Sequence, residues 1–220
     1  MVTTATPVRR TLRQRSETTT AGLLESARGL FASEGYQATM LDDVVRAAGV
    51  TKGALYHHFG GKRELFQAVF VREQERMAAL VSAAYLMHPD PWDGFAAGCR
   101  TFLEASLDPG IQRITLLDAP AVLGWEGMRD IESEFSLALL SQGLEAAIAA
   151  GRIAARPVLP LASMLLGAIC EAAMMIARAP DQAAATDEVL REVNGLLEVL
   201  TVPRQVDAVD AALPACARPS

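Results

Sequence analysis

The sequence has 220 residues, 51% of them hydrophobic, which is enough for one large or two small domains with a buried core. It is rich in alanine and leucine and only 5% aromatic, so we expect an all-α fold rather than a sheet. The net charge of −6 argues against nucleic acid, yet residues 1–65 carry +3 and residues 66–220 carry −9. Such asymmetry is typical of a nucleic-acid-binding arm on an acidic body. Three scattered cysteines and the lack of a signal-like N-terminus predict a cytoplasmic protein.

Residues 1–18 are expected to form a disordered basic arm, because their arginines stand among threonines without an apolar period. A first helix follows at helical apolar spacing, and Gly35 is expected to end it. Thr39 can cap a short second helix and Thr51 a third. Two short helices joined by a glycine-containing turn form a helix-turn-helix outline, so residues 19–66 are predicted to bind DNA through the third helix.

The segment TKGALYHHFGGK contains the only two lysines of the chain. A helix that enters the major groove needs a cation, free backbone N–H groups and little bulk at its first turn. Thr51, Lys52 and Gly53 supply a hydroxyl, a cation and a missing side chain there. The helical spacing predicts that Leu55 and Phe59 hold this helix onto its neighbours.

The outer side of the same helix provides further candidate contacts. Tyr56 and His57 are expected to donate to phosphate oxygens, and Lys62 adds a second cation from the start of a fourth helix. Arg13 and Arg15 in the arm are either further DNA contacts or charges that keep the chain soluble. No metal site and no cofactor are expected, because the adjacent histidines have no partner ligand at helical spacing.

The stretch GLFASEGYQATMLDDVVRAAGVTKGALYHHFGGKRELFQAV resembles the N-terminal DNA-binding domain of the tetracycline-repressor (TetR) family of bacterial transcription regulators. The G-Y-x-x-T, T-K-G-x-L-Y-x-H-F and K-x-x-L motifs carry the likeness, and Val45 and Arg46 are a mild departure from the family pattern. The resemblance implies that Thr39, as a helix cap, touches phosphate. It also implies that residues 67–202 form a helical effector-binding and dimerisation domain.

After a proline-punctuated stretch at residues 87–92, five longer helical segments are expected, near 92–106, 110–123, 128–150, 160–179 and 182–201. Residues 203–220 are expected to be a flexible tail. The 160–179 segment is apolar nearly all round, which predicts a buried helix; Pro160 and Glu171 argue against a membrane span. The resemblance implies that the last two segments pair with their twins in a homodimer.

Candidate effector-pocket residues are polar groups within apolar helices and the methionine and apolar side chains near them, since methionine repacks around varied shapes. Asp118 also has structural alternatives, as a helix cap or as a partner of Arg113. Glu171 can instead pair with Arg178 or with an interface residue. The predicted pocket set is Cys99, Phe102, Leu103, Leu117, Asp118, Trp125, Met164, Glu171, Met174 and Met175.

The leading interpretation is a homodimeric repressor that a small, largely apolar effector releases from a palindromic DNA operator. A hydrophobe-binding helical protein whose front domain no longer reads DNA is an alternative. A regulator of the same fold that activates transcription, or that has no effector, is another. An enzyme is not expected, because the sequence has no credible nucleophile–base pair, GxSxG motif, phosphate loop or metal-ligand spacing.

Overall fold

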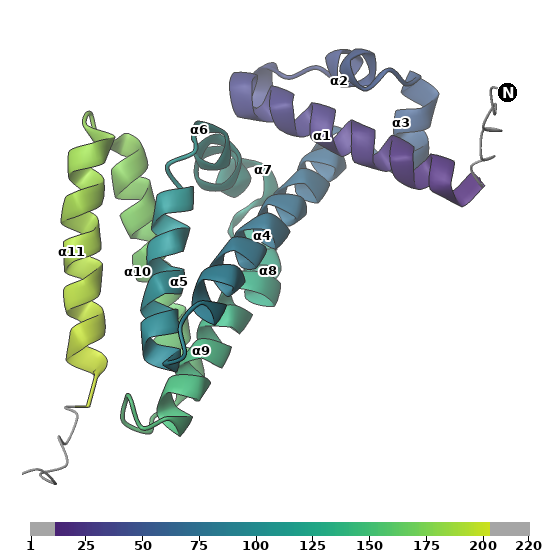
Figure 1. Ribbon diagram of the computed structural model, residues 1–220. Helices are drawn as coiled ribbons and strands as arrows, with labels where there is room; N and C mark the ends of the chain where they lie inside the picture. The colour runs from purple at the N-terminus through teal and green to yellow at the C-terminus, as the bar shows by residue number, and fades with distance from the viewer. Residues whose placement is uncertain (1–11, 203–220) are drawn as a thin grey trace, which may run out of the picture.

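The computed structural model describes residues 12–202, which form an all-helical fold as predicted (Figure 1). Within that range no strand occurs, and one isolated bridge pairs Ile153 with Thr201. The helices of the first half are α1 (Leu12–Ala38), α2 (Leu41–Ala48), α3 (Lys52–His58), α4 (Lys62–Leu86) and α5 (Pro91–Ala105). Those of the second half are α6 (Pro109–Ile111), α7 (Ala119–Leu123), α8 (Trp125–Glu132), α9 (Ala138–Ala149), α10 (Val158–Arg178) and α11 (Gln182–Leu200). Two π-helical segments, η1 (Gln112–Asp118) and η2 (Ser133–Leu137), lie between them.

The arm was predicted to be disordered through residue 18, and this is wrong for residues 12–18, which belong to α1. Residues 1–11 and the predicted tail at 203–220 lie outside the described residues. The predicted stop at Gly35 corresponds to a kink, where the backbone leaves helical geometry with φ 81° before the last turn of α1. The positive φ favours glycine here, whereas the Arg113 guanidinium that a Cβ would meet is the end of a flexible side chain that can move aside.

The first hydrophobic core joins α1, α2, α3 and the first half of α4. Helices as short as α2 and α3 bury little surface alone, so they depend on α1 and α4 to complete the unit. Phe31 and Phe66 lie edge to face with ring centroids 5.1 Å apart, and both are fully buried. Leu55 of α3 is also fully buried in this cluster, which fixes α3 to the rest of the domain.

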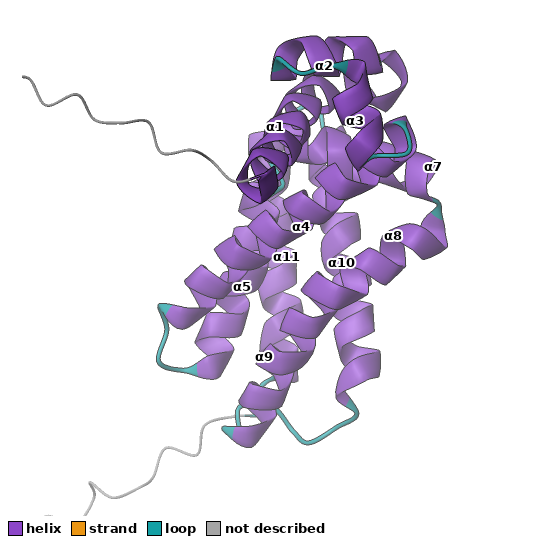
Figure 2. Cartoon of the chain, turned by 90° about the vertical axis from the view of Figure 1, so that its right-hand side faces the viewer, coloured by secondary structure: helices purple, strands orange, loops and turns teal. Residues whose placement is uncertain are grey.

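The second core lies in the bundle formed by α5, α9, α10 and α11, with Tyr85 at the end of α4 packed against it. Since α4 contributes Leu65 and Phe66 to the first core, one continuous helix connects the two cores (Figure 2). The last five predicted segments correspond to observed helices within a few residues. The π-helical geometry of η1 and η2 was not predicted.

Helix α10 was predicted to be buried on several sides, and in the single chain one of its faces is exposed. Its buried side chains, Ala162, Leu166, Ile169, Ala172, Ala173 and Ile176, follow a helical period toward α5, α9 and α11. The opposite side exposes Met164 at 73% and Met175 at 58%. By length and composition α10 would also be able to cross a membrane, a test that core helices of soluble bundles pass as well.

The two parts of the chain are joined by polar contacts at the kink of α1. Asp118, at the end of η1, accepts a hydrogen bond from the Tyr36 backbone N–H at 2.7 Å and lies 3.6 Å from the Arg113 guanidinium. Arg63 of α4 donates to the carbonyl groups of Val122 and Leu123, at 3.1 and 3.2 Å. Asp118 of η1 therefore satisfies a backbone N–H at the kink of α1, and Arg63 of α4 satisfies two backbone carbonyls at the end of α7.

Candidate nucleic-acid interface and interior cavity

One side of helix α3 is exposed to solvent, and the other side packs into the N-terminal hydrophobic core. The Thr51 hydroxyl accepts from the Ala54 N–H at 3.2 Å and caps the helix. Leu55 and Phe59 are buried as predicted, at 0% and 7% exposure. The outward residues are those predicted to contact DNA from this helix, namely Thr51, Lys52, Gly53, Tyr56 and His57, and all are exposed.

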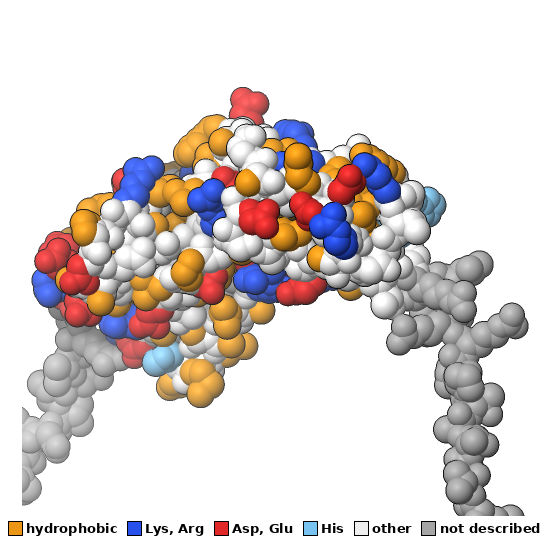
Figure 3. Space-filling view, turned by 90° about the horizontal axis from the view of Figure 1, so that it is seen from above, with side chains coloured by type: hydrophobic (Ala, Val, Ile, Leu, Met, Phe, Trp, Pro, Cys, Tyr) orange, Lys and Arg blue, Asp and Glu red, His pale blue; other side chains and the backbone are white. Residues whose placement is uncertain are grey.

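Lys52 forms an ion pair with Asp42 at the start of α2, with 2.7 Å between Nζ and the carboxylate oxygen. The hydrogen bond that Lys52 donates to the Asp42 carboxylate raises the pKa of Lys52, so the ammonium is charged at neutral pH. Arg46 pairs similarly with Asp43. Viewed from the end of the molecule that carries α1–α3, basic and acidic side chains are intermixed on the surface (Figure 3). Both pairs are solvent-exposed, and exposed pairs of this kind exchange readily with other partners.

Lys62 has a structural environment that the sequence did not predict. Its ammonium donates to the Gln37 carbonyl at 3.1 Å and lies 4.5 Å from the centre of the Tyr36 ring. Partial burial lowers the pKa of Lys62. The side chain thus ties the start of α4 to the end of α1, while two of its three N–H donors are not used by Gln37.

The prediction for Thr39 is wrong. The N-cap of α2 is Met40, and the Thr39 hydroxyl donates to the Gly35 carbonyl at 2.8 Å while the residue is fully buried. A side chain in that position stabilises the kink of α1 and has no surface to offer a phosphate. Arg13 and Arg15 fall in the first turns of α1, and their side chains lie outside the described part of the structure. His58 is half-buried, with Nδ1 3.3 Å from the Thr20 hydroxyl.

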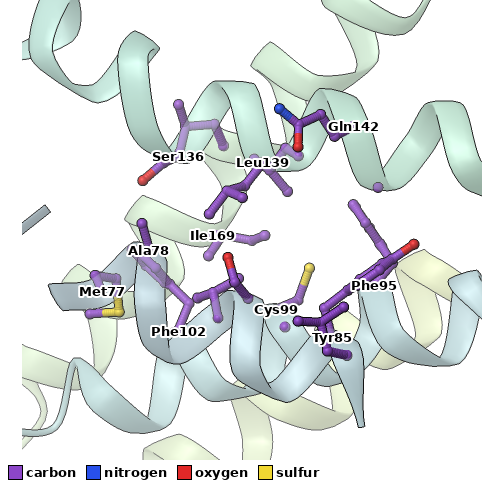
Figure 4. Close-up of a pocket in the computed structure, with 17 residues that line it drawn as sticks. Met77, Ala78, Tyr85, Phe95, Cys99, Phe102, Ser136, Leu139, Gln142 and Ile169 are labelled. Atoms are coloured by element: carbon purple, nitrogen blue, oxygen red, sulfur yellow. The ribbon is translucent and has the colours of Figure 1, made fainter. Parts of the chain in front are cut away.

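An interior cavity of about 430 Å³ opens among α4, α5, η2, α9 and α10 (Figure 4). This volume is near the lower end of the range typical of small-molecule sites. Two glycines create room in its wall, because a Cβ at Gly143 would overlap Phe95 and one at Gly98 would press on Val81. The residues that line it are Met77, Ala78, Val81, Ser82, Tyr85, Leu86, Phe95, Gly98, Cys99, Phe102, Ser136, Leu139, Leu140, Gln142, Gly143, Leu166 and Ile169.

Of the predicted pocket residues, Cys99 and Phe102 line the cavity. Burial raises the pKa of the Cys99 thiol to about 12, so the thiol is neutral at physiological pH. The other eight do not line this cavity. Leu103 is packed in the core, Met174 is half-buried outside the cavity, and Asp118 acts at the kink of α1, where it pairs with Arg113. The remaining five are exposed on the surface of the chain: Leu117, Trp125, Met164, Glu171 and Met175.

The residues of α4 and α9 that line the cavity were not predicted from the sequence. Ala78, Val81, Ser82 and Tyr85 recur at helical spacing on the second half of α4, and this small and apolar stripe was the available signal. On α10 the cavity takes Leu166 and Ile169, because the buried face of that helix is turned away from Met164 and Met175.

The outer face of α10 and the neighbouring part of α11 form an exposed, mainly apolar stripe, defined by Met164, Gly167, Ala168 and Met175 on α10 and by Leu196 and Val199 on α11. Met164, Gly167, Ala168 and Met175 lie on one side of α10, and the exposed Glu171 lies among them. The two helices stand side by side at the left of Figure 1, away from α1–α3. Contiguous exposed apolar surface of this kind marks an interaction site.

Family models match most of the chain. The model described as "Bacterial regulatory proteins, tetR family" matches residues 23–69, and "Tetracyclin repressor-like, C-terminal domain" matches residues 92–200. The first match contains α2, α3 and the start of α4, and the second runs from α5 through α11.

Individual proteins give the same result. The chain is 36% identical to a TetR-family transcriptional regulator from Pectobacterium atrosepticum, with a TM-score of 0.76, over 88% of this chain and 98% of that one. It is 29% identical over 119 residues to the transposon Tn10 TetC protein of Escherichia coli, covering 54% of this chain and 60% of that protein. It is 31% identical over 109 residues to the HTH-type transcriptional repressor AcnR of Corynebacterium glutamicum, covering 46% and 57%. The chain thus spans less than two thirds of the length of these two curated relatives.

Proposed function

Because the chain belongs to the TetR family of bacterial transcription regulators, we propose that it is a homodimeric repressor which a small apolar molecule releases from its DNA operator. The family consists of regulators that bind operator DNA and dimerise, and not of enzymes. The observation that carries the proposal is α3, whose exposed side gathers Thr51, Lys52, Gly53, Tyr56 and His57 while Leu55 is fully buried. The protein acts in the cytoplasm, where its operator is.

DNA contact follows from the geometry of α3. The first turn offers a hydroxyl, a cation and an unhindered backbone to a groove, and Tyr56 and His57 reach phosphates on the same side. Lys52 exchanges Asp42 for a phosphate oxygen, which it can do because its pair is exposed. Lys62 adds a phosphate contact through its remaining donors, and Arg13 and Arg15 extend the contact from the start of α1.

Dimerisation uses the apolar stripe of α10 and α11. A two-fold axis through this stripe makes the interface self-complementary, so Met175 of each copy is covered by the other. The dimer then carries two copies of α3, which fit two half-sites about 34–36 Å apart or a multiple of that spacing.

The cavity binds the effector, and α4 carries the signal. Met77, Ala78 and Tyr85 of α4 line the cavity, while Leu65 and Phe66 of the same helix belong to the core that holds α3. A ligand that shifts α4 therefore changes the separation of the two α3 helices in the dimer. By linkage, operator DNA weakens effector binding by the factor by which the effector weakens operator binding. Repression as the sign of regulation is supported by the likeness to AcnR.

Fluorescence anisotropy tests the proposal. Purified protein is titrated into duplex DNA from upstream of its own gene and into a scrambled duplex, across a salt series. The proposal predicts tight binding to the first duplex with a steep salt dependence, and Lys52→Ala should reduce the slope of log K against log salt by about 1.8 per dimer. Arg100→Ala, which removes an exposed cation of α5, is the matched control and should leave the slope unchanged.

If the upstream duplex binds no better than the scrambled one, selection from random duplexes shows whether an operator lies elsewhere. Failure of that selection as well would overturn the proposal in favour of a hydrophobe-binding protein that does not read DNA.

A further inference from the structure

The cavity wall has a composition that restricts the chemistry of its ligand. None of the seventeen described residues that line it is charged. The polar lining groups are the hydroxyls of Ser82, Tyr85 and Ser136, the Gln142 carboxamide and the Cys99 thiol, all of them neutral at pH 7. A charged group placed against the buried part of this wall, away from the exposed Gln142, would lose hydration and gain no countercharge from the wall, which is unfavourable.

The charges found one helical turn beyond the wall are already neutralised. Glu73 precedes Met77 by one turn of α4, and its carboxylate accepts hydrogen bonds from Arg28 and Arg76, each at 2.8 Å. Glu132 precedes Ser136 by one turn and accepts from Arg129 at 3.0 Å. An anionic or a cationic ligand would therefore have to take an arginine or a carboxylate from an existing ion pair. Neither sign of charge is compensated.

Polar groups stand at both ends of the cavity. At one end, beside Met77 and Ala78, the Ser136 hydroxyl donates to the Gln74 carboxamide oxygen at 3.4 Å, which is long for a hydrogen bond between oxygens (Figure 4). Gln74 is buried and Ser136 half-buried, so a ligand group that replaces this weak bond with a shorter one gains stability. At the other end, beside Tyr85 and Phe95, Gln142 is exposed to water. A hydrogen bond from a ligand to Gln142 would only replace one to water, so it would add less stability than one to Ser136.

We propose that the effector is an uncharged, mainly apolar molecule with a hydroxyl or carbonyl group that hydrogen-bonds to Ser136, its apolar body lying against Phe95, Cys99, Phe102 and Ile169. This inference rests on the proposed effector role of the cavity and adds the charge class of the ligand and the orientation in which it binds. Organic acids and amines of the same shape bind less tightly in this orientation, because the wall offers no countercharge.

A matched series of probes tests the charge class without knowledge of the natural ligand. Adamantanemethanol, adamantanecarboxylate and adamantanemethylammonium share a rigid apolar cage and differ in the charge of the head group at pH 7.5. Trp92 reports binding, because its ring stacks on Phe95 of the cavity wall with centroids 5.2 Å apart. The measurements use a Trp125→Phe variant, which leaves Trp92 as the only tryptophan of the chain.

The alcohol should bind at least about tenfold more tightly than either ion. Ala78→Phe fills the cavity and should abolish binding, whereas Ala79→Phe, at the exposed position next to it, should not. Ser136→Ala should weaken binding of the alcohol by about two- to tenfold, the value of one hydrogen bond, and Ser133→Ala, at an exposed position of the same segment that does not line the cavity, should have no effect.

Three results would overturn the inference: equal or tighter binding of the carboxylate or the ammonium, binding of none of the three probes, or unchanged affinity in Ser136→Ala. These titrations contain no DNA. Their failure therefore leaves the operator-binding proposal untouched, and failure of operator binding leaves the cavity result standing.

Discussion

The apolar stripe on α10 and α11 gives a quantitative prediction for Met175→Lys. Met175 is 58% exposed in the single chain, and full burial of a methionine side chain stabilises by about 1.5–3 kcal/mol. Burying the exposed 58% of Met175 in the dimer contributes about 0.9–1.7 kcal/mol to the free energy of association. Because the two-fold axis buries Met175 of both copies, this contribution is made twice per dimer. Loss of about 1.7–3.5 kcal/mol per dimer raises the dissociation constant about 20- to 300-fold, before any cost of burying lysine.

Sedimentation equilibrium measures the dissociation constant of the dimer directly. The control is Leu80→Lys, which places the same charge on a leucine of α4 that is 49% exposed and lies outside the stripe. Met175→Lys should also weaken operator binding, because α3 is intact but its partner copy is lost. An unchanged dimer constant in Met175→Lys, or equal dissociation in Leu80→Lys, would refute the assignment of this stripe to the dimer interface.

Four further predictions concern three single side chains. Glu73→Ala should lower the free energy of unfolding in urea by about 3 kcal/mol, since its carboxylate is 2% exposed, Arg28 loses its partner and Arg76 keeps only Glu25; a loss under about 1 kcal/mol would contradict this. Cys99 should react with iodoacetamide at pH 8.5 far more slowly in the native state than in urea, because its pKa is about 12. Since the folded thiol keeps its proton while the unfolded one ionises near 9, Cys99 should make unfolding easier as pH rises from 9 to 12, and a Cys99→Ala variant should lack that part of the decline. Lys62→Ala should weaken binding to every duplex and reduce the salt slope by about 0.9 per lost contact, and an unchanged slope would place its ammonium away from the phosphates.

The sequence predicted the N-terminal half well because its signals are local. Helix starts, glycine stops and the inward positions of Leu55 and Phe59 follow from spacing within a few residues. Thr39 was misassigned for a related reason: a threonine before a short helix can cap it or can donate to the carbonyl four residues earlier, and only the kink at Gly35 decides between them.

The cavity was predicted poorly because its walls come from four helices whose rotation the sequence does not determine. Helix α10 is apolar on nearly every side, so periodicity does not distinguish the face toward the cavity from the face toward a second copy. Met164 and Met175 were therefore assigned to the pocket, although Leu166 and Ile169 occupy it. Asp118 was singled out as a polar group in an apolar segment, and its actual role depends on a contact with Tyr36, 82 positions away.

A hydroxyl-radical footprint of the protein on its operator tests the central claim most directly, since it reports both the DNA contact by α3 and the symmetry of the dimer. The account predicts two protected patches on one face of the duplex, related by a two-fold axis and separated by about one helical turn or a multiple of it. A single asymmetric patch, or protection that is uniform along the duplex, would contradict a dimer that reads DNA with two copies of α3.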